Sequence, residues 1–574
     1  MQIKTILRER KLQLFFLGYI LLLVPALGLI AQNVPPGAIM AGVAVSFGLL
    51  IVIFMLSSFM KTRHIRVFYS VLLALALIPG AVFMGYLFFA KVMLSEGSIT
   101  VLLETNVEES KEFISSHLSP WVTLGIALYI LCPVVMIFRM KHIAFHRVKE
   151  HKHLFATSVM LLFLFLAIEP VAQRIYFVDF YRVLADYKVR SVLEEKAIRQ
   201  RRQQPFDVTL AGSRAPQTLL VVIGESLSRS HMSLYGYGRD TSPLLTARRA
   251  NLKVYRDVVS PQVHTIPVIR SVLSFADREH PEYLTQCPSL FELFNRAGYG
   301  TYLISNQPFD DVSSSYEPLL RQADHIVDLS KAGRPDGVIL HALEQTLEKE
   351  NGRKLIVVHL MGSHTAYKFR YPPSFSRFDR AVPDGREASP FPLKASGQTT
   401  VDQYDNSVLY NDWLMSSILD LLDRLHEPSA MIYFSDHGEE VYDFRDFAGH
   451  AAEKASSYMC EVPFIVWMSD GYMKKRPELV FQEERPYSTC DLLYSLSDLA
   501  GLSYEGYDGS RSLFSPRFAV RERFVGALPY ETVVRNTREY SPHNRIIPFV
   551  DPKTYDRIST LFRTGFWDYT LTGK

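Results

Sequence analysis

Long apolar segments fill the first third of the chain. Each approaches the roughly 20 residues that an α-helix needs to cross about 30 Å of hydrocarbon. There are five of them, almost without charged residues: 12–31, 38–60, 67–89, 121–138 and 154–171. The first is longer than a signal-peptide core and lacks a small-residue cleavage pattern, so we expect it to be retained. The pattern predicts a transmembrane domain of five helices over residues 1–174.

Basic residues gather before the first apolar segment and in every second loop. They are Lys4, Arg8, Arg10 and Lys11, then Lys61, Arg63 and Arg66, then Arg139, Lys141, Arg147, Lys149 and Lys152. Because short cytoplasmic loops are enriched in Lys and Arg, this pattern places the N-terminus in the cytoplasm. After five crossings, the rest of the chain lies on the exported side.

A polar region with aromatic residues follows the fifth apolar segment. Residues 175–202 carry tyrosines and phenylalanines first and then many basic residues. This order is typical of a helix at the membrane surface, and a plain polar linker helix is the alternative. Residues 203–215 read as a loop, so 175–215 form an interfacial helix and linker.

Residues 216–574 alternate between short apolar runs and amphipathic segments. The predicted strands are 218–224, 301–305, 354–360, 430–435 and 463–468, and the predicted helices are 289–297, 337–349 and 402–425. Near-continuous apolar strands that alternate with helices indicate an α/β domain with a mainly parallel sheet sandwiched by helices. Ligands of such sheets bind beyond the C-terminal ends of the strands.

Charge and cysteine content narrow the functional classes. The formal net charge is only +3, which argues against nucleic acid as a partner. Three of the four cysteines, Cys287, Cys460 and Cys490, belong to the exported part and permit at most one internal disulfide. The sequence leaves open whether Cys460 and Cys490 pair, and it does not give the oligomeric state.

Candidate metal ligands follow three of the predicted strands. Glu225 follows 218–224, Asp436 and His437 follow 430–435, and His450 comes thirteen residues later. The strand at 354–360 leads to His359 and then His364. Glu225, Asp436 and His437 can form one metal shell of the oxygen and nitrogen donors that zinc accepts. His364 and His450 can bind a second ion or a substrate phosphate.

Thr265 is the candidate nucleophile. It stands two residues before Pro267, which marks the first turn of a predicted helix over 268–277, and we expect Thr265 to be the N-cap. A helix N-terminus favours an alkoxide or a phosphate ester, and a metal at the hydroxyl lowers its pKa further. A cap without chemistry is the alternative.

Several short motifs occur along the chain after the apolar segments. They are Gly224-Glu225-Ser226, Ser228-Arg229, Ser233-Leu234-Tyr235-Gly236-Tyr237, Thr265, Gly362-Ser363-His364, Tyr371-Pro372, Tyr404-Asp405-Asn406, Tyr410-Asn411-Asp412 and residues 435–440. Together they resemble the phosphoethanolamine transferases of Gram-negative bacteria, which belong to the alkaline-phosphatase/sulfatase superfamily. The resemblance covers essentially the whole chain. Residues 233–237, 283–286, 359–360 and 498–504 are similar to the branch that modifies heptose in the lipopolysaccharide inner core.

The resemblance implies specific roles for these residues. It implies a zinc ion, with manganese or magnesium less favoured, held by Glu225, Thr265, Asp436 and His437. His364 and His450 map to histidines near the transferred phosphate or a second zinc, and the number of ions stays open. The segment with Thr105, Asn106 and Glu109 resembles one that contacts the donor lipid, and a polar helix cap is the alternative.

The reaction that the resemblance implies has two steps. Thr265 takes phosphoethanolamine from phosphatidylethanolamine, and a saccharide hydroxyl of the lipopolysaccharide core then receives it. The enzyme is expected in the bacterial inner membrane, with its catalytic domain, residues 216–574, in the periplasm. Residues 261–269 contain no cysteine, unlike the lipid A branch, so the core-heptose branch fits better.

Three alternatives remain after this comparison. The first is a transferase of the same superfamily that acts on lipid A, a periplasmic glucan or a lipoteichoic acid. The second, from another class, is a catalytically silent membrane scaffold or sensor, against which the complete ligand set argues. A sulfatase is disfavoured because no Cys or Ser stands in the Cys/Ser-x-Pro-x-Arg context that its formylglycine requires.

Overall fold

The computed structural model describes residues 10–31, 34–105, 110–114, 119–140, 150–308, 315–349, 352–379 and 393–540. The chain divides into two compact units. The first contains the described residues up to 103 and from 113 to 189, and the second contains those from 104 to 112 and from 190 to 540.

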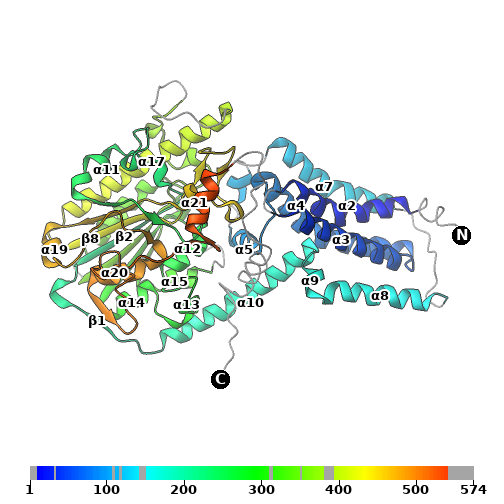
Figure 1. Ribbon diagram of the computed structural model, residues 1–574, viewed down its shortest axis with the longest axis horizontal. Helices are drawn as coiled ribbons and strands as arrows, with labels where there is room; N and C mark the ends of the chain where they lie inside the picture. Colours follow the sequence, from blue (N-terminus) through cyan, green and yellow to red (C-terminus); the bar gives the residue numbers. More distant parts are fainter. Residues whose placement is uncertain are drawn as a thin grey trace. The chain divides into compact units, whose positions relative to one another are not determined.

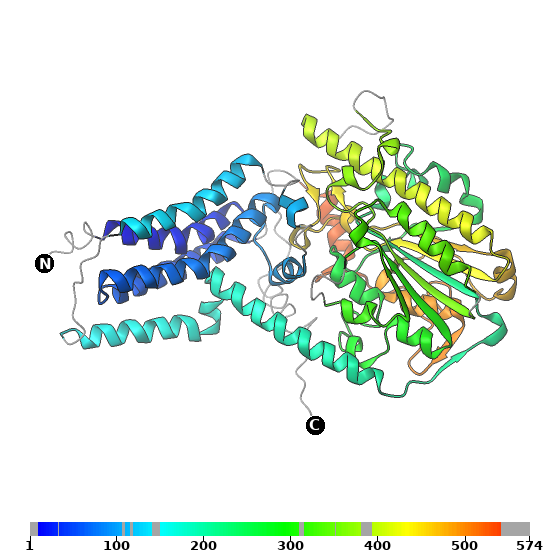
Figure 2. The same ribbon diagram turned by 180° about the vertical axis from the view of Figure 1, so that it is seen from behind.

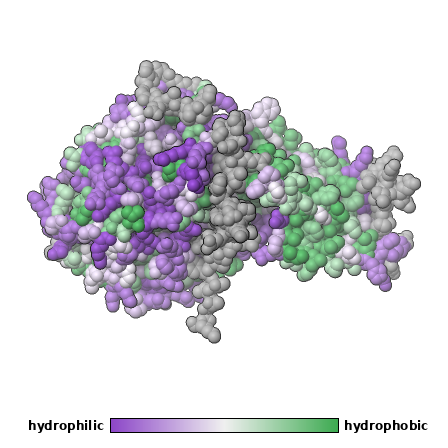
Figure 3. All heavy atoms as spheres, viewed as in Figure 1, coloured by the Kyte–Doolittle hydropathy of each residue, from purple (hydrophilic) through white to green (hydrophobic). Residues whose placement is uncertain are grey.

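The first unit is built from apolar helices. Among the described residues, four of its helices are long and apolar enough to cross a membrane, and a fifth apolar helix of 16 residues is shorter. The helices are α2 (Lys11–Leu27), α3 (Pro36–Ser57), α4 (Thr62–Ala90), α7 (Pro120–Arg139) and the shorter α8 (Lys152–Ala167). Apolar side chains gather over this unit in Figure 3. The predicted apolar N-terminal helices are therefore confirmed.

Helix α8 ends four residues before the predicted end of the fifth apolar segment. Pro170 explains the break, because proline has no amide proton for the helical bond to the carbonyl four residues earlier and its ring clashes with that carbonyl. Ile168 is extended, and a single turn, α9 (Glu169–Ala172), follows it. The predicted helix at 175–202 is present as α10 (Tyr176–Arg202), and the short α5 (Glu96–Glu104) lies between α4 and α7.

A seven-stranded sheet forms the centre of the second unit (Figure 1). Its spatial order is β3 (Lys253–Tyr255), β11 (Phe464–Met468), β8 (Ser429–Ser435), β2 (Thr218–Gly224), β7 (Arg353–His359), β5 (Tyr299–Ser305) and β6 (His325–Asp328). Only β11 runs antiparallel to its neighbours. The predicted mainly parallel sheet is confirmed. The short β3 and β6 escaped prediction because edge strands of three and four residues carry no apolar run.

Both faces of this sheet are covered, because successive side chains of a strand point to opposite faces. In β2, Leu219, Val221 and Ile223 pack in one cluster with α12 (Thr265–Val272), α14 (Leu290–Arg296) and α20 (Leu492–Ala500). Leu220 and Val222 pack in the other cluster with α16 (Ile339–Leu347) and α17 (Ala395–Asp423). Figure 2 shows these helices on the two sides of the strands. Because both faces of the sheet are buried, polar side chains can be placed at the ends of its strands.

The second unit contains no disulfide among its described residues. Cys287, Cys460 and Cys490 are free thiols, as is Cys132 in α7. The pairing of Cys460 with Cys490 that the sequence left open is thus absent.

Candidate active site

Two central strands bring a glutamate and an aspartate together. Strands β2 and β8 pair in parallel with Gly224 opposite Ser435, so Glu225 and Asp436 leave the sheet side by side. The amide of Asp436 donates to the carbonyl of Gly224 at 3.0 Å, and the amide of Ser226 donates to Asp436 Oδ1 at 3.1 Å. Both carboxylates are completely buried. The placement of candidate ligands at strand ends, expected from the sequence, is therefore observed for this pair.

Thr265 reaches the same place from another element. It is the first residue of α12, and His264 is the N-cap, so the expectation of Thr265 as N-cap is wrong. The hydroxyl is used differently from a cap, because it donates to Glu225 Oε2 at 3.1 Å instead of accepting from an amide of its own helix. It also lies 3.4 Å from His437 Nε2.

His437 is the fourth residue of this site, beside Glu225, Asp436 and Thr265. Its Nδ1 lies 2.9 Å from the carbonyl of Gly438, which can only accept, so Nδ1 carries the proton and Nε2 carries the lone pair. Nε2 lies 3.5 Å from both Glu225 Oε1 and Asp436 Oδ2. The structure thus brings together the four residues that the sequence singled out as one shell.

The donor set fits a divalent cation. Glu225, Asp436 and His437 offer three ligand atoms within 4.8 Å of one another. Asp436 Oδ2 is buried and has no hydrogen-bond partner among the described residues. A buried carboxylate oxygen without a donor is costly in a protein but expected where a cation binds. Two carboxylates, one imidazole and a hydroxyl are ligands that zinc accepts.

The electrostatics of the carboxylate pair support the same interpretation. Burial raises the pKa of Asp436 well above its ordinary value, and the neighbouring charge of Glu225 adds to the rise. Burial also opposes ionisation of Glu225, but His437, His364 and hydrogen bonds outweigh it and hold its pKa well below its ordinary value. Burial lowers the pKa of His437 to about 4, and the neighbouring His450 adds to the fall. A bound cation would displace the proton that the raised pKa of Asp436 favours.

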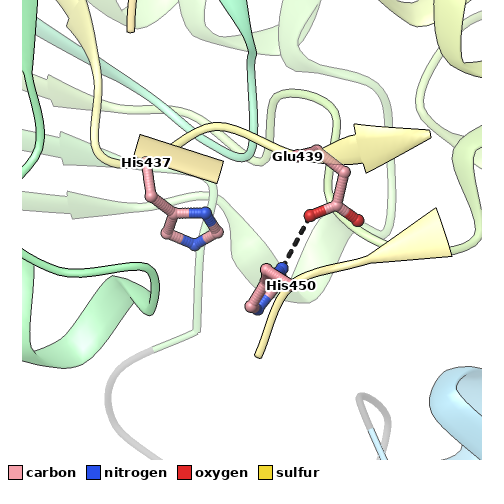
Figure 4. A group of neighbouring side chains, drawn as sticks. All are labelled: His437, Glu439 and His450. Atoms are coloured by element: carbon pink, nitrogen blue, oxygen red, sulfur yellow. Dashed lines mark hydrogen bonds and ion pairs between the residues drawn. The ribbon is translucent and has the colours of Figure 1, made fainter. Parts of the chain in front are cut away.

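His450 lies beside this group and is paired with a carboxylate. Its Nδ1 lies 2.6 Å from Glu439 Oε2, and its ring centre is 4.4 Å from that of His437 (Figure 4). Tyr367 donates to the other oxygen of Glu439 at 2.6 Å. His437, Glu439 and His450 also form a group that could hold a metal ion. Both oxygens of Glu439 are already hydrogen-bonded. We therefore interpret His450 as an imidazole that the carboxylate of Glu439 holds in position.

His359 and His364 come from the end of β7 and the residues after it. His364 follows β7, its Nδ1 is 3.8 Å from Glu112 Oε2, and it belongs to neither group that could hold a metal among the described residues. His359 ends β7, and burial lowers its pKa to about 4. Thr105 directly follows α5 and is half-buried, while Asn106 and Glu109 lie outside the described residues.

Other residues of the site were not predicted as functional. Gln307 donates to Glu225 Oε2 at 2.8 Å, and Glu439 and Tyr367 hold His450. The Tyr404 hydroxyl donates to the carbonyl of Ser226 at 2.7 Å. Tyr404 stands in a motif noted in the sequence, but Gln307 lies beyond a strand end without any spacing signal.

Comparisons with known proteins indicate the family to which the chain belongs. The sulfatase family profile matches residues 217–502. Phosphoethanolamine transferase EptC of Escherichia coli strain K12 is 32% identical over 478 residues, covering 76% of this chain and 80% of that protein. The crystal structure of the periplasmic domain of Escherichia coli EptC in complex with zinc has 32% identity and a TM-score of 0.55, covering 60% of this chain and 99% of that one.

An integral membrane protein shares the fold. Lipooligosaccharide phosphoethanolamine transferase A from Neisseria meningitidis is 21% identical, with a TM-score of 0.63. The match covers 88% of this chain and 98% of that chain, so it extends over the apolar helices and the sheet domain together.

Proposed function

Because the chain belongs to the phosphoethanolamine transferases of the sulfatase superfamily, we propose that it moves phosphoethanolamine from phosphatidylethanolamine to a sugar hydroxyl. The acceptor that we propose is heptose of the lipopolysaccharide inner core. The observation that carries the proposal is the hydroxyl of Thr265, which lies within 3.4 Å of both Glu225 and His437.

Thr265 is the proposed nucleophile. Its oxygen forms a bond to the phosphorus of the donor lipid, and the bond from phosphorus to the diacylglycerol oxygen breaks. Glu225 Oε2 accepts the hydrogen bond of the hydroxyl and orients its oxygen, and the proton of the hydroxyl ends on the diacylglycerol oxygen, which leaves as an alcohol. A phosphoethanolamine–threonine ester results. The sugar hydroxyl then attacks the same phosphorus and releases Thr265.

The residues around Thr265 have supporting roles in this proposal. Glu225, Thr265, Asp436 and His437 would hold one zinc ion, and His364 and His450 would neutralise phosphoryl oxygens or hold a second ion. A bound zinc ion supplies Lewis acidity that lowers the pKa of the hydroxyl and offsets charge on the phosphoryl group. The proposed zinc site is supported by Asp436 Oδ2, which is buried and has no hydrogen-bond partner among the described residues.

The membrane helices would bring the site to its lipid. We propose that the N-terminus is cytoplasmic and that the catalytic domain is periplasmic, as the basic loops indicate. Thr105, Asn106 and Glu109 are the proposed contacts to the donor lipid. Attachment to the bilayer raises the effective concentration of the donor without further contacts.

The acceptor is tested by mass spectrometry of lipopolysaccharide. Cells with the wild-type protein are compared with cells that carry Thr265→Ala at the same level. We expect a phosphoethanolamine group on the inner-core heptose only with the wild-type protein. The same group on lipid A alone would contradict the heptose assignment, and an unchanged envelope in both would contradict the transferase proposal for this glycolipid.

A further inference from the structure

Gln307 is a buried amide at the edge of the site, two residues beyond β5. Its backbone is fixed at the strand end, because its amide donates to Ser305 Oγ at 3.2 Å and its carbonyl accepts from the same hydroxyl at 2.9 Å. The residue is only 6% exposed. Its side chain therefore has few orientations open to it.

Both protons on Gln307 Nε2 have acceptors. One goes to Glu225 Oε2 at 2.8 Å, and the other goes to the carbonyl of Leu360 at 2.9 Å. The amide of Leu360 in turn donates to the carbonyl of Ile223 in β2 at 2.9 Å. Since both partners are acceptors, the orientation of the Gln307 amide is unambiguous. It links the ends of β5 and β7 to the carboxylate of Glu225.

Glu225 is consequently held at both oxygens. Ser226 Oγ donates to Oε1 at 2.7 Å, and Gln307 donates to Oε2, which Thr265 also reaches. Donors of this kind fix the rotation of a ligating carboxylate and typically affect metal affinity about 10–100-fold when removed. Gln307 does so without adding charge next to the Glu225–Asp436 pair.

We propose that Gln307 is a positioning residue that orients Glu225 for cation binding. The inference rests on the metal site of the proposed function. A purely structural role, in which Gln307 only joins the strand ends through Leu360, is the competing explanation. The two explanations predict different zinc affinities when Gln307 is substituted. Loss of a purely structural contact leaves the zinc affinity of the folded protein unchanged.

The test compares Gln307 with Gln322, a second buried glutamine. Gln322 is 4% exposed and is hydrogen-bonded to Ser289 and Pro318, away from the site. Gln307→Leu, Gln307→Glu, Gln322→Leu and Gln322→Glu are made in the full-length protein in detergent. The zinc dissociation constant is measured by competition with a chromophoric chelator, the visible spectrum is recorded with cobalt, and the metal-free unfolding midpoint reports folding.

We expect Gln307→Leu to weaken zinc binding about 10–100-fold and to change the cobalt spectrum, while Gln322→Leu does neither. Gln307→Glu has nearly the same shape and places a third carboxylate beside Glu225 and Asp436, so its cobalt spectrum also changes. The inference is contradicted if both Gln307 variants bind zinc with wild-type affinity. It is also contradicted if both Gln307 variants fail to fold while the Gln322 variants fold. A wild-type protein that binds no zinc overturns the proposed metal site itself, so the two failures are distinguishable.

Discussion

The hydroxyl of Thr265 donates a hydrogen bond of 3.1 Å to the carboxylate of Glu225, a residue forty positions earlier in the chain. Glu225 directly follows a central strand and Thr265 begins a short helix, so two separate elements must be held in register for this contact.

Gly362→Ala should displace Glu225. Gly362 has φ +50°, and a Cβ there would lie 2.6 Å from the carbonyl oxygen of Glu225 and 2.7 Å from its nitrogen. We expect transferase activity to fall about 100-fold, as for a small misplacement of reacting groups. Gly333→Ala is the matched control, because Gly333 has φ +57° and open space around it. Both variants share a backbone cost of about 1–2 kcal/mol, so equal activities would contradict the prediction.

Asp436→Asn should separate metal binding from stability. The side-chain oxygen of asparagine can still accept from the amides of Ser226 and His437, while its NH₂ replaces the unpartnered Oδ2. We expect bound zinc to be lost, as measured by elemental analysis. The unfolding midpoint in chelator should stay level or rise, because a buried carboxyl group that can ionise only at a cost is gone. A marked fall of that midpoint would show that the carboxylate is structural.

The sequence predicted the centre of the site better than its surroundings. The strand at 218–224 has the bounds that its apolar run indicated, and Glu225, Asp436 and His437 converge because parallel strands end at one edge. Gln307 and the pairing of Glu439 with His450 could not be predicted, since side-chain contacts between distant loops leave no periodic pattern. The N-cap assignment of Thr265 failed because the carboxylate of Glu225 competes for its hydroxyl.

Tyr367→Phe should affect His450 without touching the metal ligands. The Tyr367 hydroxyl is a donor to Glu439, which holds His450 Nδ1. Its removal leaves one oxygen of Glu439 without that donor, so we expect kcat to fall about 10-fold with zinc content unchanged. Tyr255→Phe is the control, because the buried Tyr255 hydroxyl has no hydrogen-bond partner among the described residues. Steady-state kinetics of both variants check the prediction, and equal kcat values would refute it.

A buried histidine away from the metal ligands should make stability depend on alkaline pH. Burial lowers the pKa of His231, but Asp443 and Asp405, at 2.9 and 2.6 Å from its ring nitrogens, outweigh burial and raise it to about 10. The unfolded value is about 6.5, so the folded protein holds an extra proton between these values. The stabilisation is complete below pH ~6.5 and is lost as the pH rises through about 10.

The measurement for His231 is the unfolding midpoint across that pH range. We expect the midpoint of the wild-type protein to fall with rising pH more steeply than that of His231→Gln, which cannot titrate. Parallel curves for the two proteins would mean that His231 is neutral when folded.

Intact-mass analysis of the full-length protein after incubation with phosphatidylethanolamine, without an acceptor, tests the role of Thr265 most directly. The account predicts one phosphoethanolamine adduct on the wild-type protein, located at Thr265 by peptide mapping, and no adduct on Thr265→Ala. An adduct that persists on Thr265→Ala would contradict the account.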